Sequence, residues 1–128
     1  MARRCEEEYT CPVEATIRLI GGKYKAVILW HLMQGALRYS ALHRALPRAT
    51  DKMLTQQLRE LEADGLVHRT VYPVVPPRTE YTLTAFGRSL APILDALCDW
   101  GSDYLTEKDK TPWGGVKTTR ETRGLNKP

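Results

Sequence analysis

Four hydrogen-bonding side chains recur at intervals of three and four residues in the middle of the chain. They belong to Lys52, Thr55, Gln56 and Arg59. At about 100° per residue, this spacing gathers them on one side of a helix and places Leu54, Leu58 and Leu61 on the opposite side. Such side chains hydrogen-bond base edges and phosphates in the DNA major groove. The pattern therefore predicts a helix that is buried along one face and reads nucleic acid with the other.

A polar helix face can also be solvated without binding anything, and the neighbouring features weigh against that alternative. A short helix precedes this one after a tight break, a β-hairpin follows it, and its acids, Glu60, Glu62 and Asp64, lie off the centre of the polar face. A helix-turn-helix reads DNA mainly with the N-terminal residues of its second helix, so acids near the far end are tolerated. Arg78 in the hairpin is placed for a phosphate or minor-groove contact. The predicted DNA-binding residues are Arg38, Ser40, Thr50, Lys52, Thr55, Gln56, Arg59 and Arg78.

The charge distribution suits a nucleic-acid partner. The 128 residues carry a net charge of +4, and residues 38–59 alone hold five basic residues and one acid, which gives the same +4. Residues 84–105 are net acidic and residues 106–128 are net basic. Basicity gathered in one segment is what an electrostatic contact with DNA requires.

The sequence carries no recognisable pattern for enzymatic or metal chemistry. Its three cysteines, Cys5, Cys11 and Cys98, form no Cys-x-x-Cys pair, and the histidines show no ligand spacing with them. A Gly-rich phosphate loop, a Gly-x-Ser-x-Gly elbow and a His-Glu-x-x-His pair are also absent. We therefore expect no enzyme activity, no catalytic residue, no metal and no cofactor. The longest apolar run, 26–30, is too short to span a membrane and the N-terminus has no signal peptide, which predicts a cytoplasmic protein.

Start and stop signals indicate the elements that position the polar face. Proline favours the first turn of a helix, serine and threonine cap it, and glycine ends it. The expected elements are a helix at 12–20, a mostly apolar helix at 23–34, a short strand at 37–39, a helix capped by Ser40 and ending at Leu46-Pro47, and a helix capped by Thr50 and ending at Asp64.

A β-hairpin and a long helix complete the predicted fold. Two runs of β-forming residues, 66–72 and 79–83, flank a proline-rich tip. Thr84 caps a final helix to about Leu105, which Pro92 should kink or split. This order is that of a winged helix-turn-helix, a mainly α fold with a small β-hairpin as the wing. The expected domain organisation is a flexible N-terminus at 1–10, one domain at 11–105 and a flexible basic tail at 106–128.

A series of motifs runs through residues 11–105. It comprises CPV at 11–13, GGKYK at 21–25, ILW at 28–30, RY at 38–39, KMLTQQLREL at 52–61, DGLVHR at 64–69, PRTEYTLT at 77–84 and WG at 100–101. The series closely resembles the HxlR-type winged-helix transcriptional regulators, which are relatives of the MarR group. The resemblance implies a homodimer that binds a pseudo-palindromic double-stranded DNA operator, with dimer contacts from the first and last helices.

The apolar stripe of the last helix independently favours a dimer. A domain this small cannot bury that stripe together with Trp30 and the first helix inside one monomer; the alternative is a simple core helix. The exposed face carries Asp95, Asp99 and Asp103, which would repel DNA. Two recognition helices related by a two-fold axis would meet half-sites on the order of 10 base pairs apart. The predicted dimer-interface residues are Val13, Ile17, Leu90, Ile93, Leu94, Leu97, Cys98, Trp100 and Tyr104.

Cys11 is the candidate regulatory residue. It lies just before Pro12, where unpaired backbone N–H groups and the helix dipole favour a thiolate. In many HxlR-type relatives a cysteine at the matching position senses oxidants, quinones or aldehydes, and the resemblance implies that role here. The alternative is a buried small hydrophobic residue. Cys98 is expected in the core or the dimer interface, and Cys5 is a candidate second thiol.

Three other functions stay open on the residues alone. A winged helix can bind a protein partner instead of DNA, although the charge segregation argues against this. A small-molecule effector can control a regulator that has no thiol sensor. A thiol enzyme would use Cys11, but no histidine or second cysteine is positioned in the sequence to serve it.

Overall fold

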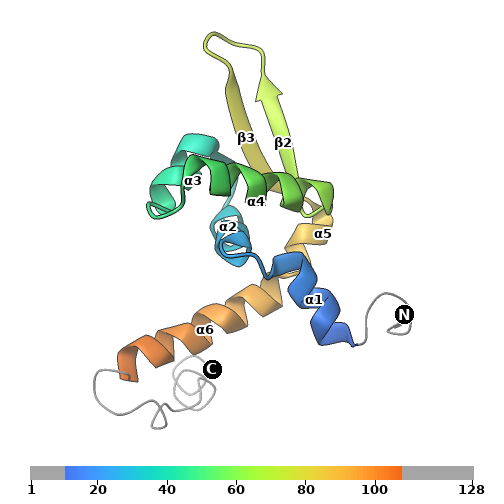
Figure 1. Ribbon diagram of the computed structural model, residues 1–128, viewed down its shortest axis with the longest axis vertical. Coiled ribbons are helices and arrows are strands. Elements are labelled where there is room, and N and C mark those ends of the chain that lie inside the picture. The colour runs from blue at the N-terminus through green and yellow to red at the C-terminus, as the bar shows by residue number, and fades with distance from the viewer. Residues whose placement is uncertain (1–10, 108–128) are drawn as a thin grey trace. The chain divides into compact units, whose positions relative to one another are not determined.

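The computed structural model describes residues 11–107, which divide into two compact units, one ending at Ser89 and the other beginning at Leu90. The flexible ends expected at 1–10 and 106–128, and with them Cys5, lie outside the described residues, except Thr106 and Glu107, which are helical. The first unit holds α1 (Pro12–Ile20), α2 (Lys25–Leu32), β1 (Leu37–Arg38), α3 (Tyr39–Ala45), α4 (Asp51–Ala63), β2 (Val67–Tyr72), β3 (Arg78–Leu83) and α5 (Ala85–Arg88); the second holds α6 (Ala91–Glu107) (Figure 1).

The core of the first unit is built from α2, α4 and the sheet, which contact one another. Leucine and isoleucine side chains dominate it, and burying each contributes about 1.5–3 kcal/mol. The fully buried ones are Ile28, Leu29, Leu32, Leu42, Leu54, Leu58, Leu61 and Leu66. The second helix is mostly apolar, as predicted, but it buries one face through Ile28, Leu29 and Leu32, whereas Val27 on another side is 39% exposed.

The bounds of α2 are shorter than the sequence predicts. The helix begins at Lys25 rather than Lys23, because Tyr24 has the non-helical backbone of an N-cap and its carbonyl accepts the first helical hydrogen bond, from Ile28; the N–H of Tyr24 donates instead to Oε1 of Gln57 over 3.0 Å. At the other end the N–H of Met33 is shared between the carbonyls of Leu29 and Trp30, which tightens the last turn. The helix therefore ends two residues before the expected Gln34.

The helix-turn-helix forms as predicted, with one correction. The helix α4 begins after Thr50, whose Oγ1 accepts the N–H of Met53 over 3.0 Å, and it ends at Ala63 before Gly65, whose φ is +80°. Ser40, however, does not cap α3. That helix begins at Tyr39 with Arg38 as its N-cap residue, because Arg38 still pairs with Glu80 as part of β1 and the chain turns from strand to helix directly after it.

The predicted hairpin is present and belongs to a three-stranded antiparallel sheet of order β1-β3-β2. Val67 pairs with Leu83 at the base of the hairpin and Tyr72 pairs with Arg78 at its outer end. Figure 1 shows these two strands projecting beyond α3 and α4 as a wing. Arg78, expected within the tip, is instead the first residue of β3, so the tip comprises only residues 73–77.

The expected final helix is split in two, and the break precedes the proline. Thr84 Oγ1 accepts the N–H of Gly87 over 3.0 Å and caps the short α5, which ends at Arg88. Pro92 lies in the first turn of α6, where its missing N–H leaves no helical hydrogen bond unmade. Among the helices of residues 11–107, none is both long and apolar enough to cross a membrane.

Candidate nucleic-acid interface

The two long faces of α4 differ in exposure. Leu54, Leu58 and Leu61 are buried, which confirms the predicted apolar stripe. The polar side chains of the other face line a shallow groove of about 440 Å³, formed by Asp51, Lys52, Thr55, Gln56 and Arg59. The four side chains of this helix that are predicted to contact DNA therefore share one continuous surface.

Two of the acids of α4 are engaged by basic side chains. Glu60 lies 2.7 Å from the Nζ of Lys25, and Glu62 lies 3.3 Å from the Nε of Arg69 in β2. Each pair offsets a negative charge beside the polar face, which reduces the repulsion that these carboxylates would exert on a phosphate backbone.

The start of α4 is tied to the start of α3. The hydroxyl of Tyr39 donates to Oδ1 of Asp51 over 2.7 Å, and Nε2 of His43 lies 3.2 Å from the same oxygen. Burial, followed by the hydrogen bond to Asp51, raises the pKa of Tyr39, so the phenol stays protonated and donates at neutral pH. No motif in the sequence indicates this positioning role. The isolated Asp51, alone among five basic residues in 38–59, was the only signal.

The predicted wing and strand residues gather at a second groove. Arg38, Ser40 and Arg78 line it with the tip of the hairpin, and its volume is about 650 Å³. Arg38 and Ser40 are exposed, whereas Arg78 is half-buried. Thr50 lines neither groove, and its hydroxyl is used as the cap of α4.

Arg78 is held against the hairpin rather than extended from its tip. Its guanidinium carbon lies 4.8 Å from the centre of the Tyr72 ring, within the range of a cation–π contact. The Tyr72 hydroxyl in turn donates to Oε1 of Glu80 over 3.1 Å. Within residues 11–107, the buried Nε of Arg78 has no hydrogen-bond partner. The guanidinium of Arg78 also lines the groove, where its positive charge favours an anion.

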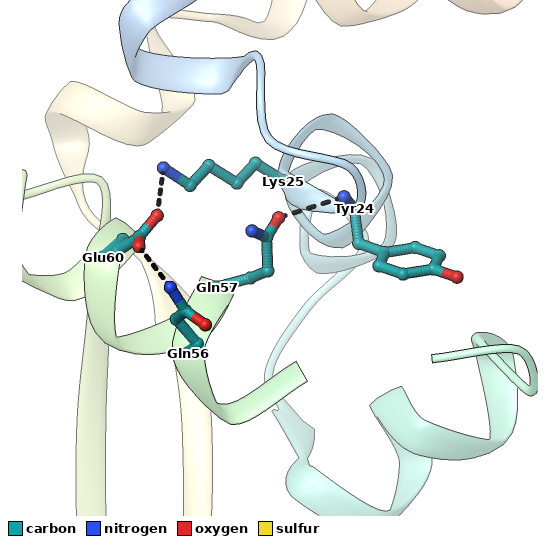
Figure 2. Close-up of polar contacts among 5 residues, drawn as sticks. All are labelled: Tyr24, Lys25, Gln56, Gln57 and Glu60. Atoms are coloured by element: carbon teal, nitrogen blue, oxygen red, sulfur yellow. Dashed lines mark hydrogen bonds and ion pairs between the residues drawn. The ribbon is translucent and has the colours of Figure 1, made fainter. Parts of the chain in front are cut away.

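A polar network connects the start of α2 to α4, as Figure 2 shows. The buried Lys25 ammonium contacts Oε1 of Glu60, and Oε2 of Glu60 accepts from Nε2 of Gln56 over 3.2 Å. These contacts, that with Lys25 first, lower the pKa of Glu60, so its carboxylate is ionised at neutral pH. Beside it, Gln57 Oε1 accepts the N–H of Tyr24. Helical periodicity places Glu60 off the centre of the polar face, and no local pattern in the sequence indicates Lys25 as its partner.

Cys11 is the N-cap residue of α1, as its place before Pro12 predicts. Its Sγ accepts the N–H of Glu14 over 3.4 Å, and the residue is exposed. The alternative of a small hydrophobic residue buried in the chain is therefore wrong. Cys98 is also exposed, which excludes the core position considered for it and leaves the dimer interface as its predicted place.

Each unit exposes apolar side chains predicted to form the dimer interface. On α1, Val13 and Ile17 have exposed fractions of 69% and 56%. On α6, Leu97 and Trp100 are about half exposed, and the ring of Trp100 stacks on that of Tyr104 with centroids 5.6 Å apart. Exposed apolar clusters of this kind are typical of protein–protein contacts. The remaining predicted interface residues divide between exposed Ile93 and buried Leu90 and Leu94.

The model of the HxlR-like helix-turn-helix family matches residues 19–109, which is more than half of the chain. The chain belongs to this family. It is an HxlR-type transcriptional regulator with a winged helix-turn-helix, as its sequence motifs implied. The match takes in the helix-turn-helix, the wing and α6 of this HxlR-type regulator.

Relatives of this HxlR-type regulator occur in bacteria and archaea. It is 56% identical to the helix-turn-helix-type transcriptional regulator YtcD of Bacillus subtilis over 100 residues, which cover 78% of this chain and 79% of YtcD. It is 50% identical to a helix-turn-helix-type transcriptional regulator of Methanothermobacter thermautotrophicus over 106 residues, covering 83% and 81% of the two chains.

Among solved structures, the HxlR-type regulator is similar to the redox regulator HypR. The oxidised form of HypR is 52% identical, with a TM-score of 0.70, and the match covers 72% of this chain and 95% of that one. The reduced form is 49% identical, with the same TM-score, and covers 77% and 94%.

Proposed function

We propose that this regulator recognises a specific DNA sequence with α4, inserting Lys52, Gln56 and Arg59 into the major groove. Together with Thr55 they follow the spacing i, i+3, i+4 and i+7, which aligns them on one face opposite the buried leucines. This sorted face is the observation that carries the proposal. Long side chains with amide and guanidinium groups read adenine and guanine edges, and a bidentate pair contributes about 1–3 kcal/mol of discrimination.

The second groove supports the duplex backbone in this proposal. Arg38 and Ser40 are exposed on its wall, and the half-buried Arg78 also lines it. Contacts of this type orient a protein on DNA without reading its sequence. The N-terminus of α4 adds Thr50 and the oriented N–H groups of its first turn, which favour a phosphate.

A homodimer accounts for the exposed apolar side chains of α1 and α6. Two copies related by a two-fold axis would read the two halves of a pseudo-palindrome, spaced on the order of 10 base pairs. We expect Ile17→Asp to give a monomer in sedimentation equilibrium, because a carboxylate cannot be buried unpaired in an apolar contact. Val71→Asp is the matched control, since Val71 is equally exposed but lies on the wing. A dimer that survives Ile17→Asp would remove α1 from the interface.

Selection of bound duplexes from a random DNA pool tests the proposed function. The wild-type protein should enrich a pseudo-palindrome, and affinity for it should fall steeply with added salt, because the release of DNA counterions on binding becomes less favourable. If no sequence is enriched and every duplex binds weakly, the result would instead favour a winged helix that binds a protein partner.

Regulation through Cys11 is the second part of the proposal. Support comes from its exposure, from its place at the N-terminus of α1, and from the similarity to HypR, a redox regulator solved in oxidised and reduced forms. Oxidised glutathione supplies the simplest chemistry: the Cys11 thiolate attacks one sulfur, a mixed disulfide forms, and one glutathione thiolate leaves.

The effect of oxidised glutathione on operator binding separates thiol control from control by a small ligand. We expect the affinity of wild-type protein and of Cys98→Ser to change on treatment and to recover with a reductant, whereas Cys11→Ser should not respond. Equal responses of Cys11→Ser and Cys98→Ser would reject Cys11 as the sensor. A response shared by both variants would assign the sensing to Cys5, whereas no response in any of the three proteins would favour the small-molecule effector.

A further inference from the structure

The amide of Gln56 is held in one orientation by Glu60. Its Nε2 donates to Oε2 of Glu60 over 3.2 Å, and Figure 2 shows the amide nitrogen turned toward the carboxylate and the amide oxygen turned away. An ionised carboxylate only accepts hydrogen bonds, so the reverse orientation would set oxygen against oxygen. Glu60 therefore determines which amide atoms Gln56 presents to a ligand.

Glu60 is itself fixed from the other side. The Lys25 ammonium lies 2.7 Å from Oε1, which leaves Oε2 for Gln56, and the Lys25 side chain is only 8% exposed. A buried ammonium is costly unless it is paired, so the Lys25 side chain stays beside the carboxylate of Glu60. Gln57, the neighbour of Gln56, is also held, since its Oε1 accepts the N–H of Tyr24. This part of α4 is thus fixed against the start of α2.

Close packing leaves little room for this network to shift. A Cβ on Gly22 would lie 2.6 Å from Oε1 of Gln57 and 3.0 Å from Cδ of Lys25. The chain that enters α2 therefore passes close to both side chains, and a larger residue at this position would displace the Gln57 amide. The carboxylate of Glu60 is an acceptor that Lys25 anchors beside an exposed base-reading candidate.

We propose that Glu60 is a specificity-determining positioning residue, which orients the Gln56 amide so that it selects adenine over guanine. This inference rests on the proposed function of α4. Adenine presents an acceptor, N7, beside a donor, the N6 amino group, whereas guanine presents two acceptors, N7 and O6. Gln56 has an outward oxygen and one N–H left over, which complement adenine. Guanine would need both N–H groups, and Glu60 has taken one.

Base preference in the selected DNA tests this inference, with four proteins compared: wild type, Glu60→Gln, Gln56→Ala and the double variant. We expect wild type to select adenine at one position per half-site and Gln56→Ala to lose that preference. Glu60→Gln keeps the shape of the side chain, but the Lys25 ammonium only donates and therefore holds the new amide oxygen, which turns the amide nitrogen toward Gln56 and favours the reversed Gln56 amide. It should lower the adenine-to-guanine ratio at that position on the order of tenfold, and have no effect in the Gln56→Ala background.

Asp64→Asn is the matched control for charge. Asp64 is an exposed acid directly after the last residue of α4. Removing its charge should change overall affinity without changing the adenine-to-guanine ratio. Glu60→Asp provides a second variant, because it keeps the charge but is one methylene too short to hold Gln56, and it should relax the ratio as Glu60→Gln does. Thermal unfolding verifies that each variant is folded.

The outcomes are distinguishable from failure of the proposed function. If wild type selects no sequence, the proposed function itself fails. If wild type selects adenine through Gln56 but both Glu60 variants keep the adenine-to-guanine ratio, the proposed function stands and the role of Glu60 is rejected. A change of ratio by Glu60→Gln that persists without Gln56 would also overturn it, since Glu60 would then act by another route.

Discussion

Tyr39 donates its hydroxyl hydrogen to Oδ1 of Asp51 over 2.7 Å, and this bond joins the first residue of α3 to the first residue of α4. The two helices of a helix-turn-helix must keep a fixed angle if one is to lie in the major groove while the other crosses the backbone. Here two side chains of α3, those of Tyr39 and His43, contact the same oxygen of Asp51 across the turn, beside the candidate DNA surface. Asp51 also lies in the groove lined by Lys52 and Arg59, so the same contacts hold its carboxylate beside the reading face.

Tyr39→Phe removes this hydrogen bond and keeps the ring. We expect the free energy of unfolding to fall by about 0.5–1.5 kcal/mol, since Asp51 is exposed and regains water as a partner. Operator affinity should fall as well, because the turn loses a contact that orients α4. Urea denaturation and gel shift measure the two effects. Unchanged affinity in a destabilised variant would show that the bond serves stability alone.

Alkaline pH should weaken the fold through two tyrosines. Burial raises the pKa of Tyr81 and, together with the hydrogen bond to Asp51, that of Tyr39. The folded chain therefore holds these phenol protons more tightly than the unfolded chain. Their contribution is complete below about pH 10, the unfolded value, and is lost as the pH rises through the folded values. Urea denaturation from about pH 8 to about pH 11 should give a smaller decline in Tyr39→Phe and Tyr81→Phe than in wild type. An identical decline in all three proteins would contradict this assignment.

Most elements near the candidate site are predictable from the sequence because their signals are local. Pro12 and the caps Thr50 and Thr84 act within one helical turn, and Gly65 ends α4 through its own backbone conformation. Leucine spacing likewise gives the buried face of α4 without knowledge of what covers it. The start of α3 was not predictable from Ser40, because it depends on the strand pairing of Arg38 with Glu80, which is distant in the sequence.

The positioning contacts were not predictable, because they join residues far apart in the sequence. Lys25 and Glu60 are separated by two elements, and neither residue type is unusual where it stands. Helical periodicity places Glu60 beside the polar face but carries no information on what faces it from α2. Arg78 shows the same limit: its strand was predictable within one residue, but its contact with the Tyr72 ring depends on the register of the hairpin.

Arg59 and Arg38 should give different signatures in DNA binding. Arg59→Ala removes a side chain of the α4 groove, so it should relax base preference at one position and cost about 1–3 kcal/mol on the selected operator. Arg38→Ala removes a charge beside the wing groove, so it should weaken binding to all duplexes alike and reduce the salt slope by about one. Gel shifts over a salt series with operator and scrambled duplexes separate the two. Base discrimination lost in Arg38→Ala but kept in Arg59→Ala would reverse the assignment of the two grooves.

Gly87 and Gly101 form a matched pair that tests how α5 fits the first unit. A Cβ at Gly87 would lie 2.2 Å from the carbonyl oxygen of Leu66, a backbone atom that cannot move aside without displacing β2. Gly87→Ala should therefore lower the free energy of unfolding by about 1–3 kcal/mol, the usual cost of overpacking. A Cβ at Gly101, which is inside α6, would meet no atom of residues 11–107 within 4 Å apart from its chain neighbours and the nearby backbone of its own helix. Gly101→Ala should therefore raise helix stability by up to about 1 kcal/mol. Thermal unfolding at one protein concentration compares both with wild type, and equal shifts in the two variants would reject the close contact between α5 and Leu66.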